Sequence, residues 1–396
     1  MTRKPHVFLP HRRDLLAGLA GISVAFAGRA AAAAGSSRRK LVVMVARGGV
    51  DGLSLTPPYG EAAYAGLRGA LALAPPGAPG GVLKLDGTFG LHPAMPGLHA
   101  MALAGEARIA PAVAIPGRIR SHFEAQDMLE NGSERVYGLE SGWLNRALQA
   151  LGSTRGLAVG AQTPLVLRGP VQAASWSPGP SLPEGDRVAT ILMDLYRDDA
   201  LLAPALAAGL SADAMAEAAT GGQPVRRNDV RGLGAAIARF MTAEDGPDVV
   251  ALSLDGFDTH ARQGAAVGQL ANRLGPVDQL LTGLKNGLGP AWRDTAVVMA
   301  TEFGRTVRIN GTGGTDHGTA STLVLAGGAL KPGGIVGDWP GLEERRLFEN
   351  RDLAPTLDVR AVFKGLLRDH LGVDRAKLDT VVFPESGGVR AVDGLV

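Results

Sequence analysis

Five short apolar runs, many of whose residues are β-branched, are the feature that most constrains the fold of this chain. Each run ends in polar or glycine-rich residues, and segments with helical periodicity separate the runs. A continuous apolar run of this length is typical of a strand that is buried on both faces of a mostly parallel sheet. The five predicted strands are 41–46, 108–115, 248–254, 295–300 and 321–326.

Segments with apolar residues at spacings of three and four predict the helices between these strands. They are 94–104, 190–210, 231–242, 267–288 and 354–371. The alternation of strands and helices predicts an α/β fold, a three-layer sandwich with a mostly parallel central sheet. The stretch near 152–188 is rich in Gly, Pro and Ser and is predicted to be an irregular insertion in a single domain that covers residues 35–396.

The N-terminus carries the parts of an export signal: a charged start with Arg12 and Arg13, an apolar stretch, and an alanine run that ends at Ala34. The adjacent arginines favour the twin-arginine type. The apolar stretch, of about 11 to 15 residues, is shorter than the roughly 20 that span a bilayer. We therefore predict that residues 1–34 are a twin-arginine signal peptide and that the mature chain, without a transmembrane segment, is periplasmic or extracellular.

Charge and cysteine content exclude several classes of function. The whole chain has a net charge of +2, but residues 1–34 hold five cationic side chains and one aspartate, so the remainder has a net charge of −2. Nucleic acid is therefore not a predicted partner. The chain has no cysteine, which excludes thiolate zinc sites, thiol nucleophiles and iron–sulfur clusters.

Acidic and histidine side chains recur at the ends of the predicted strands, where open α/β sheets bind ligands. Asp51 follows the first strand, and Asp258 and His260 follow the third. The fourth strand runs on to Glu302, and a glycine-rich turn just ahead of the fifth contains Asp316 and His317. Carboxylates and imidazoles bind divalent cations where thiolates are absent. The pattern predicts a site for one or two ions of zinc, manganese or calcium.

Each of these residues also has an ordinary structural interpretation. Asp51 is suited to capping the turn that follows it, and Asp258 with His260 is suited to a turn. Glu302 and Arg305 have the spacing of an ion pair at a loop. The joint placement favours the metal site, because independent structural roles would not put acids or histidines at nearly every strand end.

A nucleophile is predicted where the second strand gives way to a helix. Ser121 stands at this helix start, whose N-terminus stabilises a developing alkoxide and a bound oxyanion. His122 or a metal ion would assist its ionisation. The alternative is that Ser121 caps the helix, with Glu124 completing a capping box. Ser54 is the competing nucleophile.

Arginines at the same strand ends are candidates for holding an anionic substrate. Arg47 follows the first strand, Arg120 the second and Arg305 the fourth. A guanidinium group binds phosphate or sulfate oxygens through paired donors. Arg118 and Arg120 have the alternative of lying in a solvated loop.

Nine sequence blocks, in order, resemble the signature blocks of the DUF1501 family of exported bacterial proteins. The resemblance covers about residues 40–385. The blocks are RGGVDGLS at 47–54, GLHPA at 90–94, RSHFEAQ at 120–126, GWLN at 142–145, FDTH at 257–260, TEFGRT at 301–306, GTDHG at 314–318, GDWP at 337–340 and RDLAPT at 351–356.

That family resembles the alkaline phosphatase and sulfatase superfamily, which implies a three-layer α/β sandwich with a two-metal site. By position, the resemblance implies that Ser121 is the nucleophile. It implies that the metal ligands are Asp51, Asp258, His260, Glu302 and His317. The chain departs from the superfamily at Glu302-Phe303, where Asp-His is usual, and in the short spacing from Asp258 to His260. Without a cysteine to become formylglycine, the usual sulfatase mechanism is excluded.

Two functions follow from these observations. The first is a metal-dependent hydrolase of phosphate or sulfate esters, acting on a small-molecule or saccharide ester. The second is a non-catalytic exported binding protein that uses the same cleft for an anionic or saccharide ligand.

Overall fold

The structure, a computed structural model, describes residues 38–179, 187–200, 202–220, 225–226 and 228–396. The predicted signal peptide therefore lies outside the described residues. Within the described part of the chain, none of the helices combines the length and the apolar character needed to cross a membrane.

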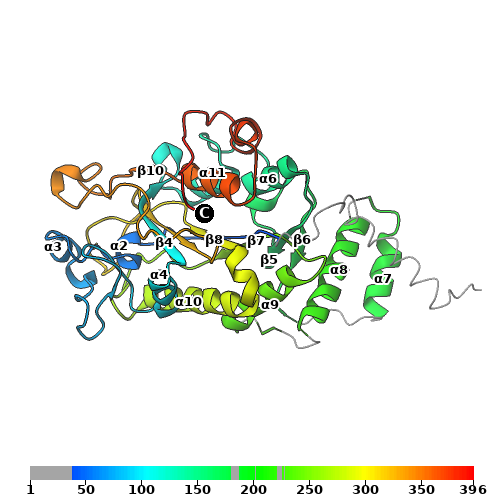
Figure 1. The fold of residues 1–396 in the computed structure, drawn as a ribbon, viewed down its shortest axis with the longest axis horizontal. Helices are drawn as coiled ribbons and strands as arrows, with labels where there is room; N and C mark the ends of the chain where they lie inside the picture. The colour runs from blue at the N-terminus through cyan, green and yellow to red at the C-terminus, as the bar shows by residue number, and fades with distance from the viewer. Residues whose placement is uncertain (1–37, 180–186, 201, 221–224, 227) are drawn as a thin grey trace, which may run out of the picture. The chain divides into compact units, whose positions relative to one another are not determined.

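An eight-stranded sheet with the order β10-β4-β9-β8-β1-β7-β5-β6 forms the centre of the fold (Figure 1). Five of its strands coincide with the predicted strands to within one residue at each end. They are β1 (Lys40–Ala46), β4 (Ala107–Ala114), β7 (Val249–Leu254), β8 (Thr295–Ala300) and β9 (Ser321–Ala326). The other three are β5 (Gly156–Val159), β6 (Ala174–Trp176) and β10 (Leu357–Asp358).

The direction of β9 decides which loops meet. Strand β1 runs parallel to β7 and β8, whereas β9 runs antiparallel to both of its neighbours, β4 and β8. Because β9 is reversed, it begins at the edge of the sheet where β1, β7 and β8 end. The residues ahead of β9 therefore lie at the same edge as the residues that follow the other three strands.

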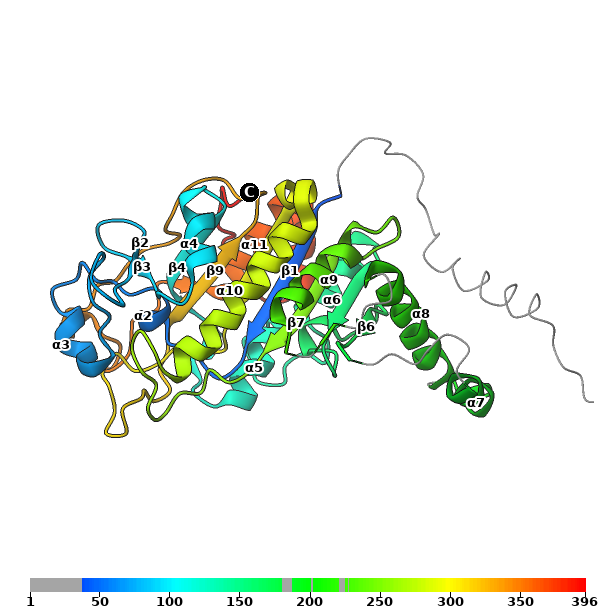
Figure 2. The same ribbon diagram turned by 90° about the horizontal axis from the view of Figure 1, so that it is seen from below.

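Helices cover both faces of the sheet, as Figures 1 and 2 show. Side chains of β1 alternate between the two faces, with Val43 in one hydrophobic core and Met44 in the other. The core around Val43 includes residues of α5 (His122–Asn131), α6 (Trp143–Leu151) and α11 (Val359–Asp369). The core around Met44 includes residues of α4 (Pro96–Leu103), α9 (Val230–Thr242) and α10 (Gln269–Leu288). The predicted three-layer α/β architecture with a mostly parallel sheet is confirmed.

Four of the five predicted helices correspond to α4, α9, α10 and α11, but the predicted helix at 190–210 is two helices. These are α7 (Arg187–Tyr196) and α8 (Leu202–Thr220). The Asp199 carboxylate accepts a hydrogen bond from the Leu202 amide at 2.8 Å and so caps a new helix. Pro204 lies in the first turn of α8, where a missing amide proton costs little.

The segment near 152–188 is not irregular throughout, contrary to our expectation. It contains β5 and β6, which extend the sheet beyond β7 in parallel. Both strands are too short to produce a recognisable apolar run, although every residue from Gly156 to Val159 is buried. The remaining α-helices and strands of the described residues are α2 (Gly52–Leu55), α3 (Tyr64–Arg68), the paired β2 (Leu83–Lys84) and β3 (Gly90–Leu91), and α12 (Arg375–Lys377).

Candidate metal centre

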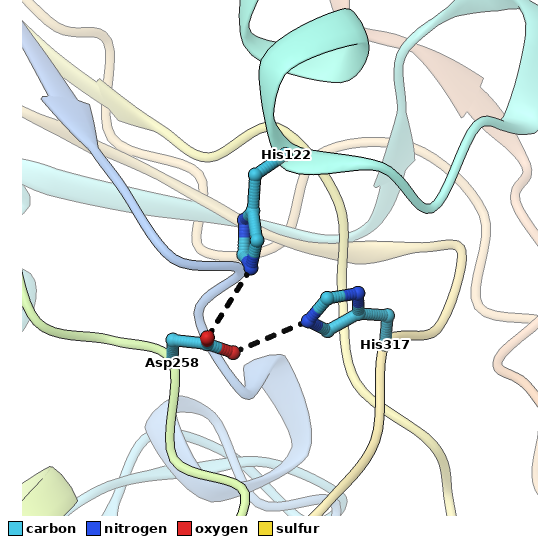
Figure 3. Close-up of side chains that lie close together, drawn as sticks. All are labelled: His122, Asp258 and His317. Atoms are coloured by element: carbon cyan, nitrogen blue, oxygen red, sulfur yellow. Dashed lines mark hydrogen bonds and ion pairs between the residues drawn. The ribbon is translucent and has the colours of Figure 1, made fainter.

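Two histidines and an aspartate from separate parts of the chain meet at the edge of the sheet where β1, β7 and β8 end (Figure 3). His122 is the first residue of α5, Asp258 follows β7, and His317 lies in the loop ahead of β9. One ligand atom from each of the three residues lies within 4.8 Å of the others. The reversed direction of β9 brings His317 to this edge.

His260 is the third imidazole beside Asp258. Its Nε2 is 3.0 Å from Asp258 Oδ1 and 3.0 Å from His317 Nε2. His317 Nε2 is itself 3.2 Å from Asp258 Oδ1, and His122 Nε2 is 3.3 Å from Asp258 Oδ2. The Nε2 atoms of three rings therefore face one carboxylate.

The opposite nitrogen of each ring has an acceptor. Nδ1 of His122 contacts Glu302 Oε1 at 2.9 Å, Nδ1 of His317 contacts the Arg120 carbonyl at 2.8 Å, and Nδ1 of His260 contacts Asp316 Oδ1 at 3.3 Å. A carbonyl or an ionised carboxylate accepts hydrogen bonds and donates none, which assigns the ring proton to Nδ1. A ring that carries its proton at Nδ1 alone then presents an Nε2 lone pair to Asp258.

This arrangement fits a divalent cation. Lone pairs and a carboxylate that converge without a positive charge between them repel one another. His122 Nε2 is buried and, although it lies 3.3 Å from Asp258 Oδ2, it makes no hydrogen bond within the described residues. This nitrogen is therefore left to ligate a metal ion. Imidazole nitrogen with carboxylate oxygen is typical of zinc or manganese sites, whereas calcium takes oxygen ligands. The donor set therefore disfavours the calcium ion that the sequence left open.

Burial and hydrogen bonds shift the pKa values of these groups in different directions. Burial raises the pKa of Glu302, but hydrogen bonds from His122, Gln126 and the Gly48 amide outweigh it and keep that pKa below its usual range. The same Glu302 hydrogen bond raises the pKa of His122. Burial lowers the pKa of His317, which favours the neutral, ligating form.

Arg305 fastens the loops of the centre together. Its side chain is fully buried, and each of its three nitrogens donates to an acceptor. The acceptors are the carbonyls of Gly48, Gly49 at 2.7 Å, Phe257 at 3.1 Å and Thr315 at 3.0 Å, and Asp258 Oδ1 at 2.5 Å. These residues follow β1, follow β7 and precede β9. Arg305 is thus occupied inside the protein and is not turned to a substrate, contrary to our expectation.

Asp51 lies apart from the histidine cluster. It is buried, caps α2 and forms an ion pair with Arg68. Its Oδ2 also accepts from Gln263 at 2.6 Å and from the Ser54 hydroxyl at 2.9 Å. The structural interpretation of Asp51 therefore applies in place of the predicted metal ligand, and Arg68 is the partner that the sequence did not reveal. Ser54 is buried in this network, which removes it as an accessible nucleophile.

Two further predicted ligands act through the imidazoles. Glu302 and Asp316 bind Nδ1 atoms behind the cluster, and Glu302 has no exposed surface. His122, predicted to activate Ser121, instead directs Nε2 toward Asp258. Ser121 occupies the N-cap position of α5, but its exposed side chain makes no capping hydrogen bond.

The other two arginines have carboxylate partners. Arg47 donates to Glu130 at 2.7 Å, and Glu130 is buried near the far end of α5. Arg120 donates to Asp352 at 2.6 Å and to Glu349 at 2.7 Å. Asp352 lies in the RDLAPT block at 351–356, but nothing in the sequence paired it with Arg120, and Arg68 lies in none of the nine blocks.

Replacing Arg305 by Met should lower the free energy of unfolding by about 3 to 5 kcal/mol, because buried acceptors in three loops lose their donor. Arg308→Met is the matched control: Arg308 is 42% exposed in its pair with Glu344, and its loss should cost at most about 1 kcal/mol. Urea unfolding of both variants measures the difference. Equal urea midpoints for the two variants would contradict the role of Arg305 in holding the three loops together.

Replacing Asp51 by Asn should make the free energy of unfolding depend less on pH in the acidic range. Burial raises the pKa of Asp51, but Arg68, Gln263 and Ser54 outweigh it and hold that pKa below its usual range. The ionised pair therefore stabilises the fold fully above about pH 4 and loses this contribution as the pH falls further. Urea unfolding between about pH 6 and 3 should show the wild type approaching the variant; a constant gap would refute this linkage.

Several solved structures are similar to this chain at low sequence identity. The PsFucS1 sulfatase from Pseudoalteromonas sp. is 13% identical, with 98% of this chain and 77% of that chain covered and a TM-score of 0.42. The C-terminal periplasmic domain of EcEptC from Escherichia coli is 10% identical, with 89% and 88% covered and a TM-score of 0.40. A protein in the alkaline phosphatase superfamily from Vibrio parahaemolyticus is 10% identical, with 81% and 71% covered and a TM-score of 0.36.

A search of curated proteins gives no match. The family whose profile matches is described as "Protein of unknown function (DUF1501)", and the match extends over residues 38–382. This span includes Asp258 and the histidines around it, His122, His260 and His317, and also Arg305 with the loops that it joins. The chain therefore belongs to the DUF1501 family.

Proposed function

We propose that this chain is an exported, metal-dependent hydrolase of phosphate or sulfate esters. The observation that carries the proposal is the convergence of three histidine Nε2 atoms on Asp258, with an acceptor fixed behind each ring. The exposed Ser121 directly precedes His122 at the start of α5. A cation site and a hydroxyl are thus neighbours at the edge of the sheet where ligands bind in α/β folds.

His122, Asp258 and His317 would hold the ion, with His260 beside them. A bound ion would supply positive charge that polarises the ester and stabilises the charge that develops during its cleavage. Glu302 and Asp316 keep the rings oriented by holding Nδ1. Partners of this kind raise metal affinity by about 10- to 100-fold in known sites.

Ser121 is the nucleophile in this proposal. Its hydroxyl is exposed, and the free amides of the first turn of α5 favour negative charge beside it. The serine oxygen bonds to the phosphorus or sulfur atom, the ester bond breaks, and the leaving oxygen takes a proton from solvent to become an alcohol. The hydroxyl proton passes to solvent, and water then releases phosphate or sulfate from the serine. His122 is not the base, because both of its ring nitrogens face the cluster or Glu302.

A non-catalytic binding protein is the second candidate. The observation that favours it is the state of the three arginines expected to steady an anion, since Arg47, Arg120 and Arg305 all have carboxylate partners. Such a protein would bind the metal ion and an anionic or saccharide ligand without hydrolysing an ester.

Replacing His122 or His317 by Ala should remove the bound metal, because each change deletes a ligand atom from the cluster. Elemental analysis of the purified mature protein should fall from about one ion per chain to a trace. His99→Ala is the control, since His99 donates to the Lys84 carbonyl on another part of the surface. Asp51→Asn should also retain the ion. Unchanged metal content in both cluster variants would refute the proposed site.

Hydrolysis should be detected with a panel of aryl phosphates and aryl sulfates, and Ser121→Ala should reduce it by at least about a thousandfold while retaining the metal. Ser54→Ala is the matched control and should keep most of the activity, because that hydroxyl is buried. Full activity in Ser121→Ala would exclude this nucleophile. The hydrolase proposal itself fails if the protein neither binds a metal nor cleaves any ester with any divalent ion supplied.

A further inference from the structure

An unpaired guanidinium group stands three residues before Ser121. Arg118 ends the short 3-10 turn Pro116–Arg118, is exposed, and has a positive φ of 53°, which is strained for a residue with a side chain. Its guanidinium carbon lies 4.6 Å from the centre of the Phe348 ring. Within the described residues its side chain has no carboxylate partner and no hydrogen bond.

Arg120, two residues on, binds two carboxylates of different character. Asp352 is fully buried and also accepts from the Thr319 hydroxyl at 2.9 Å, so it is a permanent part of the fold. Glu349 is 54% exposed and contacts Arg120 Nη2 at 2.7 Å. An exposed pair of this kind contributes about 0 to 1 kcal/mol, so another anion can replace Glu349.

The cationic groups outnumber the carboxylates at this place. Arg351 also pairs with Asp352, at 3.1 Å, so Arg120 and Arg351 share Asp352 and Glu349, and Arg118 adds a third cationic group without a carboxylate partner among the described residues. When Glu349 moves away, Asp352 is the one carboxylate left to them. The Phe348 ring lies under two of the guanidinium groups, at 4.6 Å from Arg118 and 5.9 Å from Arg120.

This cationic group is joined to the metal centre through the main chain. The Arg120 carbonyl accepts the hydrogen bond from His317 Nδ1 at 2.8 Å, and Ser121 follows Arg120 directly. An anion held by the Arg120 side chain is therefore close to, but separate from, an ester at the histidine cluster.

We infer that Arg118 and Arg120 form a second anion subsite in which Glu349 occupies the place of the ligand's anionic group. The substrate class that fits is an ester with another anionic group, a carboxylate, sulfate or phosphate, on the same molecule. This substrate class rests on the proposed function, whereas anion binding at Arg118 and Arg120 does not.

Calorimetric titration of inorganic sulfate into the purified protein tests the subsite. Glu349→Gln should bind sulfate about tenfold more tightly than the wild type, because the competing carboxylate is gone. Glu344→Gln is the control: Glu344 is exposed, pairs with Arg308 at 3.1 Å and lies five residues away, so the same loss of charge should change affinity by at most about twofold.

Adding Arg118→Ala to the Glu349→Gln variant should reverse the gain. Equal sulfate affinity in the two glutamate variants, or a gain that survives the loss of Arg118, would overturn the inference. The metal centre is the same in all of these proteins, so differences between them report on the arginines. Since no turnover is measured, failure here is distinct from failure of the hydrolase proposal.

Discussion

The buried guanidinium of Arg305 is the interaction on which the candidate metal centre depends. Its planar set of donors reaches carbonyls in loops from three distant parts of the chain and one oxygen of Asp258. Water has no access to replace it, so each acceptor would be left unsatisfied without it. Burial raises the pKa of Asp258, yet the hydrogen bond and the charge of Arg305 oppose it, and that pKa lies below its usual range. The same side chain thus sets both the geometry and the charge of the centre.

The topology of the sheet then determines which residues Arg305 can join. Loops after β1 and β7 meet because those strands are parallel neighbours, and the loop with His317 joins them because β9 is reversed. His122 comes from a different connection, at the start of α5 after β4, and its Nδ1 contacts Glu302, which follows β8. The three histidines that face Asp258 come from three different connections, and of these His260 follows the same strand as Asp258, so the centre forms when the sheet is assembled.

The sequence was sufficient to predict the five main strands, four helices and the gathering of Asp258, His260 and Glu302 after their strands, because these follow from periodicity and from the direction of parallel strands. It did not predict that β9 is reversed, which brings His317 to the same edge. The sequence was not sufficient to assign a role to each acid and histidine at that edge of the sheet. Whether a carboxylate faces a cation or holds an imidazole depends on contacts across the fold, as Glu302 and Asp316 illustrate. Asp51 was misassigned because its partner, Arg68, lies in a segment without any motif. Strands β5 and β6 were too short to register as apolar runs.

X-ray absorption spectroscopy of the purified protein tests most directly whether the imidazoles around Asp258 bind a divalent ion. For zinc, we expect nitrogen and oxygen ligands at about 2.0 to 2.2 Å together with the outer-shell scattering of imidazole rings. An ion surrounded by oxygen ligands alone, without imidazole scattering, would contradict this expectation.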